Sequence, residues 1–146
     1  ATKAYDSLSD AMKSRLNGLR VTHDAAGRRR KSRTGLAADN AQHETHDLVV
    51  HPLVRRHPYT DKKILYVSSG ECEAIDGMAD DEAVALIDKL SAIIIKDEFI
   101  YRHKWQVGDV LMWDNCAVQH LALHDYALPL RRMMWRISVG YTEVYE

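Results

Sequence analysis

Apolar residues recur at helical spacing in two parts of the chain, each preceded by a residue that can cap a helix. Ser9 is a suitable N-cap for a helix that runs to about Asn17, where Gly18 can end it. Asp80 is the expected N-cap of a second helix, over about 81–95. The side chains expected to face the core are Leu8, Met12, Leu16 and Leu19 in and beside the first helix, and Val84, Ile87, Leu90 and Ile94 in the second.

Short stretches of β-branched and aromatic residues between turn residues predict strands in much of the remaining chain. The expected strands cover residues 19–22, 48–54, 64–67, 98–105, 117–123 and 130–139. Gly108-Asp109 and Asp114-Asn115 are turn sequences. Residues 110–113 and 117–123 are therefore expected to form the two strands of a β-hairpin. The return strand of this hairpin would carry His120.

The last expected strand places two arginines on one face. Side chains alternate along a strand, so Arg132 and Arg136 share one face and Arg131 shares the other with Trp135. If the Arg132 face points inward, the two guanidinium groups need anionic partners, because an unpaired buried charge is strongly unfavourable. Arginine suits carboxylates, sulfonates and phosphates, so this pattern predicts a pocket for small acidic molecules. The alternative is an edge strand whose arginines reach water.

Length and composition are typical of one soluble globular domain. The 146 residues are 46% hydrophobic and 28% charged, and the formal net charge of -1 argues against nucleic-acid or membrane partners selected by bulk charge. No apolar run reaches bilayer length, and the first residues lack the features of a signal peptide. Cys72 and Cys116 provide neither a disulfide framework nor zinc-type spacing, so a reducing, cytoplasmic location is expected.

The segment 25–47 has no periodicity and contains a basic run over residues 28–33. A phosphate or nucleic-acid patch is one interpretation, but no aromatic residues alternate with the basic ones to stack on bases. A mobile, solvated loop is therefore expected. His43, His46 and His51 could suggest zinc, although they have no recognisable ligand spacing and no cysteine nearby.

The C-terminal part contains the sequences WDNCAVQH, HDY and RRMMWR, at residues 113–120, 124–126 and 131–136. This combination resembles the C-terminal signature of the taurine dioxygenase and phenoxyacetate dioxygenase family, the iron(II)- and 2-oxoglutarate-dependent oxygenases. HPLVRRHPYTDKKILYVS at residues 51–68 resembles another part of the same family. The resemblance implies a mainly β fold with flanking helices, a double-stranded β-helix of the jelly-roll, cupin-like type.

The resemblance also implies roles for individual residues. His120 matches the last iron ligand of a His-x-Asp…His facial triad. Without the resemblance, a histidine in an apolar strand is more often a hydrogen-bonded core residue than a ligand. Arg132 matches the arginine that binds the distal carboxylate of 2-oxoglutarate, and Arg136 matches the one that meets the acidic group of the substrate. The loop before Arg131 is about one residue longer than is usual, so Arg131 remains an alternative to Arg132.

The loop that contains Ser68 and Gly70 matches a loop that lines the substrate pocket in the family. Family members often have asparagine and an aromatic residue there, so this sequence leaves the substrate open. The implied reaction hydroxylates a small acidic substrate, such as a sulfonate or aryloxyalkanoate, with Fe(II), 2-oxoglutarate and O2, and releases succinate and CO2. The implied assembly is a homo-oligomer, a dimer or tetramer.

The sequence contains no His-x-Asp. The nearest equivalents, His23-Asp24, His46-Asp47 and His124-Asp125, are adjacent pairs. The family resembled is considerably longer, so residues 1–146 are expected to be the C-terminal part of one dioxygenase domain, whose His-x-Asp pair would precede Ala1. Two alternatives remain open: a catalytically incomplete pseudoenzyme, and a metal-independent module that binds acids through Arg132 and Arg136.

Overall fold

The computed structural model describes residues 1–24, 48–123, 127, 129 and 133–140, and the expected loop at 25–47 lies outside them. The helices are α1 (Thr2–Asp6), α2 (Asp10–Leu16) and α4 (Asp80–Ile94), followed by the 3-10 helix η1 (Asp97–Phe99). The strands are β1 (Arg20–His23), β2 (Val49–Pro52), β3 (Val54–Arg56), β4 (Lys63–Leu65) and β5 (Cys72–Ile75). These described elements are a mixture of helices and short strands, and the double-stranded β-helix stays a prediction.

The strands form two small open sheets. In the first the order is β2-β1-β5, with both pairings antiparallel, and in the second β3 pairs with β4, also antiparallel. The predicted strand 48–54 is divided because Leu53 connects the two sheets. Its N–H donates to the carbonyl of Leu19, and its own carbonyl accepts from the N–H of Tyr66. Leu53 is fully buried at this junction.

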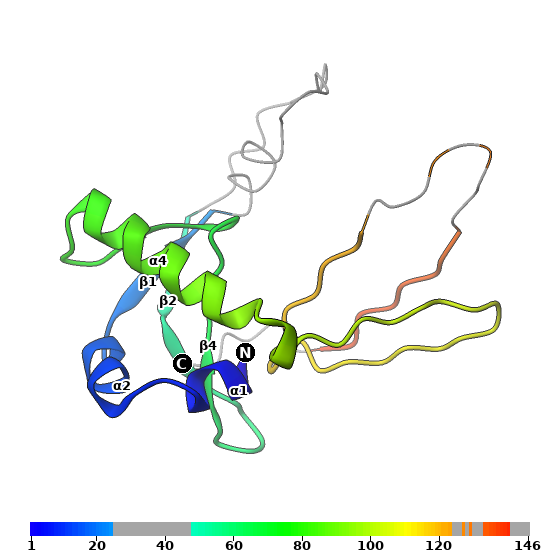
Figure 1. Ribbon diagram of the computed structural model, residues 1–146, viewed down its shortest axis with the longest axis horizontal. Coiled ribbons are helices and arrows are strands. Elements are labelled where there is room, and N and C mark those ends of the chain that lie inside the picture. The colour runs from blue at the N-terminus through cyan, green and yellow to red at the C-terminus, as the bar shows by residue number, and fades with distance from the viewer. Residues whose placement is uncertain (25–47, 124–126, 128, 130–132, 141–146) are drawn as a thin grey trace.

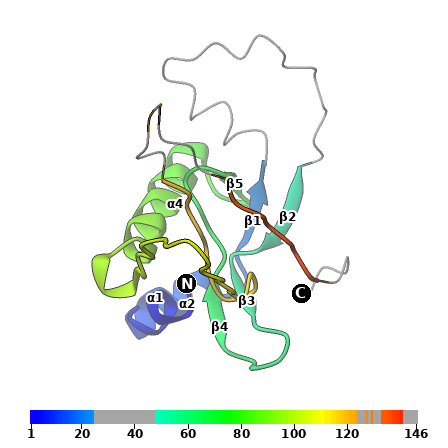
Figure 2. The ribbon, with the colours of Figure 1, turned by 90° about the vertical axis from the view of Figure 1, so that its right-hand side faces the viewer.

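One hydrophobic core joins the helices to both sheets. α4 contacts β5, and α1 contacts β4 (Figure 2). The largest side chains that are almost completely buried are Leu16, Leu53, Leu65, Ile87, Leu90, Val21, Val67 and Cys72. Within the described residues, no helix combines the length and the apolar character needed to cross a bilayer.

The first predicted helix is confirmed. The Ser9 hydroxyl accepts a hydrogen bond from the N–H of Met12 at 3.3 Å, which satisfies one of the free donors at the start of α2. Gly18 follows the helix with φ of +80°, a conformation that glycine adopts without steric cost. Leu8 and Leu16 are buried as expected, and Met12 and Leu19 pack against the core.

The second helix forms, but two details of its prediction were wrong. The N-cap is Ala79 rather than Asp80, which is the first helical residue, and no side chain caps the helix. Val84 is 48% exposed, whereas Ala83 and Leu86 are buried with the other three residues of the expected stripe. The apolar stripe of α4 is broad, so spacing alone does not fix its rotation. The helix places its small Ala83 side chain toward the core.

The strands expected at 98–105, 117–123 and 130–139 were wrong wherever the structure describes them. η1 replaces the start of the first, and residues 100–123 and 133–140 contain no strand. The turns were predicted correctly: Gly108 has φ of +93°, and the N–H of Ala117 donates to the carbonyl of Asp114. Figure 1 shows these segments in two long loops that extend away from the helices and the two sheets. Many of their apolar side chains are exposed, among them Val107, Val110, Met112, Trp135, Ile137 and Val139.

We expect Leu90→Ala to lower the free energy of unfolding by about 2–5 kcal/mol, because it removes a fully buried side chain from the inner face of α4. Val84→Ala is the matched control on the same helix. Since Val84 is 48% exposed, its truncation should change stability by less than about 0.5 kcal/mol. Urea unfolding followed by circular dichroism measures both. Equal losses for the two variants would contradict the rotation of α4 described above.

Candidate functional site

His120 follows a tight turn at residues 114–117 and is exposed. Its imidazole packs against the indole of Trp113, with ring centroids 5.1 Å apart and an interplanar angle of 47°. Trp113 Nε1–H donates to the side-chain oxygen of Asn115 at 2.9 Å, which fixes the indole to the same turn. Among the described residues, no polar group hydrogen-bonds to the His120 ring. Its nitrogens are therefore available to a ligand such as a metal ion.

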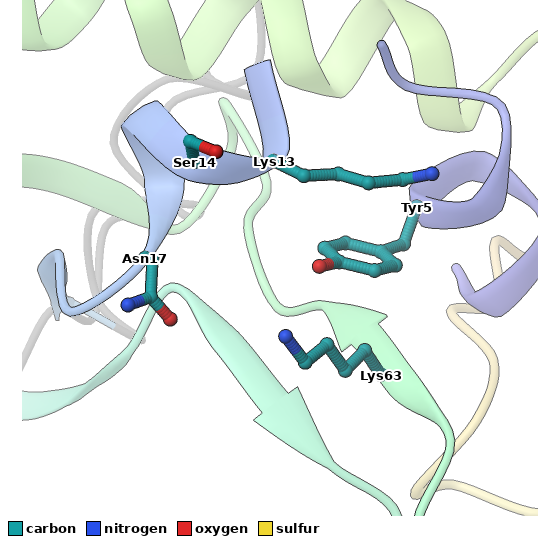
Figure 3. Close-up of a pocket in the computed structure, with 5 residues that line it drawn as sticks. All are labelled: Tyr5, Lys13, Ser14, Asn17 and Lys63. Carbon is teal, nitrogen blue, oxygen red and sulfur yellow. The ribbon is translucent and has the colours of Figure 1, made fainter. Parts of the chain in front are cut away.

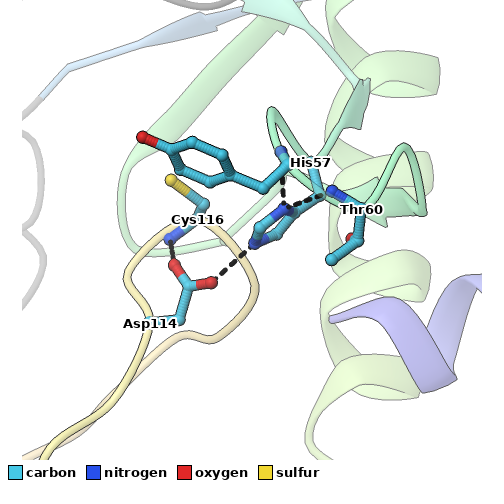
Figure 4. A network of polar contacts seen from close by, with 5 residues as sticks. His57, Thr60, Asp114 and Cys116 are labelled. Atoms are coloured by element: carbon cyan, nitrogen blue, oxygen red, sulfur yellow. Dashed lines mark hydrogen bonds and ion pairs between the residues drawn. The ribbon is translucent and has the colours of Figure 1, made fainter.

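Among the described residues, the side chains of Asp114 and Gln119 attach this turn to the β3–β4 hairpin. His57 Nε2 lies 2.6 Å from Asp114 Oδ2 (Figure 4), and Gln119 Nε2 donates to the carbonyl of Val67 at 2.8 Å. His57 lies just after β3 and Val67 just after β4, so both contacts come from one hairpin. The segment that leads to His120 is thus held at both ends.

The His57 imidazole is buried, with 8% of its side chain exposed, whereas Asp114 is 52% exposed. The other ring nitrogen of His57, Nδ1, accepts from the N–H groups of Tyr59 and Thr60, both at 3.2 Å. The second carboxylate oxygen of Asp114 accepts from the N–H of Cys116 at 2.8 Å. The hydrogen bond from His57 lowers the pKa of the Asp114 carboxyl, and the Cys116 N–H lowers it further, so the group is charged at neutral pH.

Hydrogen bonds between its own residues stabilise the loop that is predicted to line a substrate pocket. The Ser68 hydroxyl accepts from the N–H of Gly70 at 3.3 Å, and the Ser68 carbonyl accepts from the N–H groups of Glu71 and Cys72. Both Ser68 and Gly70 are half-buried. Because Gln119 bonds to the carbonyl of the residue before Ser68, this loop lies next to the segment that carries His120.

The predicted arginines are only partly covered by the structure. Arg131 and Arg132 lie outside the described residues. Arg136 is described and exposed, and within the described chain no acidic group pairs with it. The inward-facing arrangement of Arg132 and Arg136 therefore stays a prediction.

A second group of polar side chains comes from both sheets: His23, His51 and Cys72 from the three-stranded one, Arg55 from β3 and Tyr66 from just after β4. The His23 ring is 4.7 Å from the Tyr66 ring and 5.4 Å from the His51 ring, measured between centroids. The Arg55 guanidinium lies 4.7 Å from the centroid of Tyr66, and Cys72 Sγ lies 3.6 Å from His23 Nδ1. Part of this group could have been predicted if the pairing of the two strands had been known. Val21 pairs with His51, so alternation along β1 places His23 diagonally across from His51.

Burial, followed by the charge of His51, lowers the pKa of His23 to about 4. Nothing in the described residues brings three His, Cys, Asp or Glu side chains together in a way that could hold a metal ion. His51, one of the histidines considered for zinc, instead packs against Tyr66 with centroids 5.3 Å apart. His43 and His46 lie outside the described residues.

A surface hollow of about 360 Å³ lies between α1, α2 and β4 (Figure 3), and none of the predicted site residues lines it. Tyr5, Lys13, Ser14, Asn17 and Lys63 line it. The ammonium groups of Lys13 and Lys63 each lie 5.7 Å from the centroid of the Tyr5 ring. The attraction between a cation and an aromatic face accounts for this arrangement without a bound ligand.

Comparison with known proteins connects the chain to one group of enzymes. The family model described as "Taurine catabolism dioxygenase TauD, TfdA family" matches residues 1–138. The chain is 34% identical over 139 residues to the alpha-ketoglutarate-dependent 2,4-dichlorophenoxyacetate dioxygenase of Cupriavidus pinatubonensis, covering 92% of this chain and 46% of that protein. It is 31% identical over 137 residues to the alpha-ketoglutarate-dependent sulfonate dioxygenase of Saccharomyces cerevisiae, covering 93% and 32%. The chain spans less than half the length of these relatives.

Solved structures give the same grouping. The crystal structure of AAD-2 in complex with Mn(II) and N-oxalylglycine is similar with a TM-score of 0.62 and 30% identity, over 72% of this chain and 41% of that one. The crystal structure of a taurine dioxygenase from Burkholderia xenovorans is similar with a TM-score of 0.55 and 30% identity, over 73% and 33%.

We expect the stability of the fold to decrease as the pH falls from about 6.5 toward 4. His23 has an ordinary pKa of 6.5 when unfolded and about 4 when folded, so the unfolded state takes up the proton first. The charged groups that influence His23 are His51, Glu71 and Arg55. Because His23 is partly exposed, solvent screening reduces the expected loss of folding free energy to about 1–2 kcal/mol. The loss levels off below about pH 4.

Urea midpoints measured between pH 7 and pH 4 test this expectation. His23→Asn should give a shallower slope than the original chain. Some slope should remain, because burial also lowers the pKa of His51. An unchanged slope in the variant would assign the pH dependence to other groups.

Proposed function

The chain belongs to the taurine catabolism dioxygenase TauD, TfdA family, and from this we infer that it supplies part of the active site of an Fe(II)- and 2-oxoglutarate-dependent dioxygenase. The observation that carries the proposal is the family match over residues 1–138, together with relatives named as alpha-ketoglutarate-dependent dioxygenases. The similarity to a structure that contains Mn(II) and N-oxalylglycine supports the same cofactors, since Mn(II) can stand in for Fe(II) and N-oxalylglycine resembles 2-oxoglutarate in shape and charge.

His120 fits the role of an iron ligand. Its imidazole is exposed, and the described residues leave its nitrogens free of hydrogen bonds. Imidazole is a common ligand of non-haem Fe(II), which in a facial triad is completed by a second His and a carboxylate. The sequence contains no His-x-Asp, so the proposed site requires those two ligands from outside these 146 residues.

The remaining residues would orient the two acids. In this proposal Arg132, or alternatively Arg131, binds the distal carboxylate of 2-oxoglutarate, and Arg136 binds the acidic group of the substrate. Ser68 and Gly70 would line the substrate pocket, in agreement with the contact between Gln119 and the neighbouring Val67. Bound Fe(II) supplies O2 activation, which couples conversion of 2-oxoglutarate to succinate and CO2 with hydroxylation of a substrate C–H bond.

Substrate class, fold and assembly complete the proposal. The relatives are named for sulfonates and for 2,4-dichlorophenoxyacetate, both organic acids, and we propose a substrate of this kind. The complete domain is proposed to be a double-stranded β-helix in a cytoplasmic homo-oligomer. The apolar residues exposed in 100–123 and 133–140 support the fold, since strands of such a barrel bury one face.

The second candidate is a pseudoenzyme or a metal-independent module that binds acids through its arginines. Residues 1–146 contain no His-x-Asp pair, so this candidate applies if the complete protein has none either. It predicts acid binding that chelators do not change, whereas in the dioxygenase removal of iron would weaken the binding of 2-oxoglutarate.

The protein encoded by the complete gene, mixed anaerobically with Fe(II) and 2-oxoglutarate, should show a weak visible metal-to-ligand charge-transfer band. His120→Ala should abolish it. His103→Ala is the control, because His103 bonds to Asp109 within its own turn and has no proposed ligand role. If the wild type shows no band but still binds 2-oxoglutarate in the presence of a chelator, the acid-binding module replaces the dioxygenase.

Arg132→Ala and Arg131→Ala should separate the two candidates for the 2-oxoglutarate anchor. Loss of a charge-assisted contact to a carboxylate should raise the KM for 2-oxoglutarate about 10- to 100-fold, with a smaller effect on the KM of the acidic substrate. We expect this result for Arg132→Ala, with Arg131→Ala close to the original enzyme. Succinate release measures both, and the reverse order would assign the role to Arg131.

A further inference from the structure

We propose that His57 is a positioning residue, whose imidazole clamps Asp114 and thereby fixes the turn that presents His120. The proposal rests on the proposed function only in naming His120 as an iron ligand. The clamp itself is a property of the metal-free chain, because it consists of contacts between residues of this sequence (Figure 4).

The tautomer of His57 follows from its neighbours. Nδ1 accepts from two backbone donors, the N–H groups of Tyr59 and Thr60, so this nitrogen presents its lone pair and carries no proton. The proton is therefore on Nε2, which points at Asp114 Oδ2 at 2.6 Å. The β3–β4 turn thus fixes both the orientation of the ring and the direction of the hydrogen bond that it donates.

Asp114 suits the other side of this contact because it uses both carboxylate oxygens. Oδ2 accepts from His57, and Oδ1 accepts from the N–H of Cys116 inside the turn. The Asp114 carbonyl accepts from the N–H groups of Ala117 and Val118, both at 3.1 Å. One residue therefore holds the turn together and attaches it to the body. Asparagine has a single side-chain acceptor and cannot make both side-chain bonds.

The clamp extends to His120 through the geometry of the turn. Trp113, beside Asp114, packs against the His120 ring, and Gln119 bonds to the carbonyl of Val67. The tethers at Asp114 and Gln119 thus enclose the turn, and His120 is the next residue after the second. Of the two tethers formed by described residues, release of Asp114 leaves Gln119, about which the turn can rotate. The orientation of a metal-binding imidazole depends on such supporting contacts.

The test uses variants that separate the two sides of the His57 ring in the full-length protein. In His57→Asn, the side-chain oxygen can take the place of Nδ1 and keep the bonds to Tyr59 and Thr60, but it cannot reach Asp114. In His57→Gln, the amide nitrogen can take the place of Nε2 and donate to Asp114, but the turn loses its acceptor. Asp114→Asn removes the acceptor from the opposite side.

The matched control is Asp61→Asn, on the same β3–β4 turn. Asp61 Oδ2 lies 2.7 Å from Arg56 Nη1, almost the same distance as the clamp, but the Asp61 side chain is 77% exposed. Its φ of +56° suits asparagine as well as aspartate, so this substitution adds no backbone strain. The control therefore breaks an ion pair of similar length without touching the turn that carries His120.

Amide hydrogen exchange of the metal-free protein is measured first. His57→Asn and Asp114→Asn should each accelerate exchange at Cys116, Ala117 and Val118 about tenfold or more, while Asp61→Asn leaves it unchanged. His57→Gln should stay closer to the original protein at these amides. If His57 supports only its own hairpin, His57→Gln will accelerate amide exchange more than His57→Asn, which will exchange almost like the original protein. That result would overturn the proposal.

Fe(II) affinity, measured by anaerobic titration, is the second readout. His57→Asn and Asp114→Asn should weaken binding about 10- to 100-fold, as loss of a supporting contact typically does. Unchanged affinity in both variants would refute the positioning role. If the two variants exchange faster but the unmutated protein binds no Fe(II), the clamp is established and the proposed dioxygenase is rejected. The two hypotheses therefore fail separately.

Discussion

Backbone pairing between strands divides the described part of this chain into a part with paired strands, up to β5, and a C-terminal part without them. β1 has β2 on one side and β5 on the other, and Leu53 continues the hydrogen bonding from this sheet to the β3–β4 hairpin. Residues 100–123 and 133–140 have the composition of strands but no strand partners among the described residues. An extended segment without neighbours leaves its backbone groups to water and its apolar side chains exposed. The part that carries His120 therefore depends on side-chain contacts for its position.

This division explains which elements could be predicted from the sequence. α2 with its Ser9 cap and the turns at Gly108 and Asp114 depend on residues close in sequence, and all were predicted. The composition of β1 also predicted a strand, but its pairing with β2 and β5 involves residues far away in sequence and was not predicted. The rotation of α4 was missed, because whether Ala83 or Val84 faces inward depends on the sheet beneath the helix. The strands beyond η1 were wrong for the same reason. β-propensity describes how well a residue fits into a sheet, and it does not supply the neighbouring strand.

The candidate site shows the same limit. The motif at residues 113–120 led to His120, and the structure adds the contact of its ring with Trp113. His57 lies 57 positions before its partner Asp114, and no spacing rule connects residues at that distance in sequence. One local signal was present: a histidine that precedes Pro58 in a polar turn can accept hydrogen bonds from the following N–H groups, as aspartate and asparagine side chains do.

Burial, more than distance, decides which polar contacts can position a segment. The His57–Asp114 and Arg56–Asp61 contacts come from the same hairpin and measure 2.6 and 2.7 Å. An exposed pair such as Arg56–Asp61 contributes about 0–1 kcal/mol, because water competes for both partners. His57 is buried and its second nitrogen is already bonded, so its ring has little freedom to lose. Its hydrogen bond to a charged acceptor contributes toward the lower end of about 1.5–3 kcal/mol, since Asp114 is half exposed. A buried donor of fixed direction can thus orient an exposed turn that buries little apolar surface of its own.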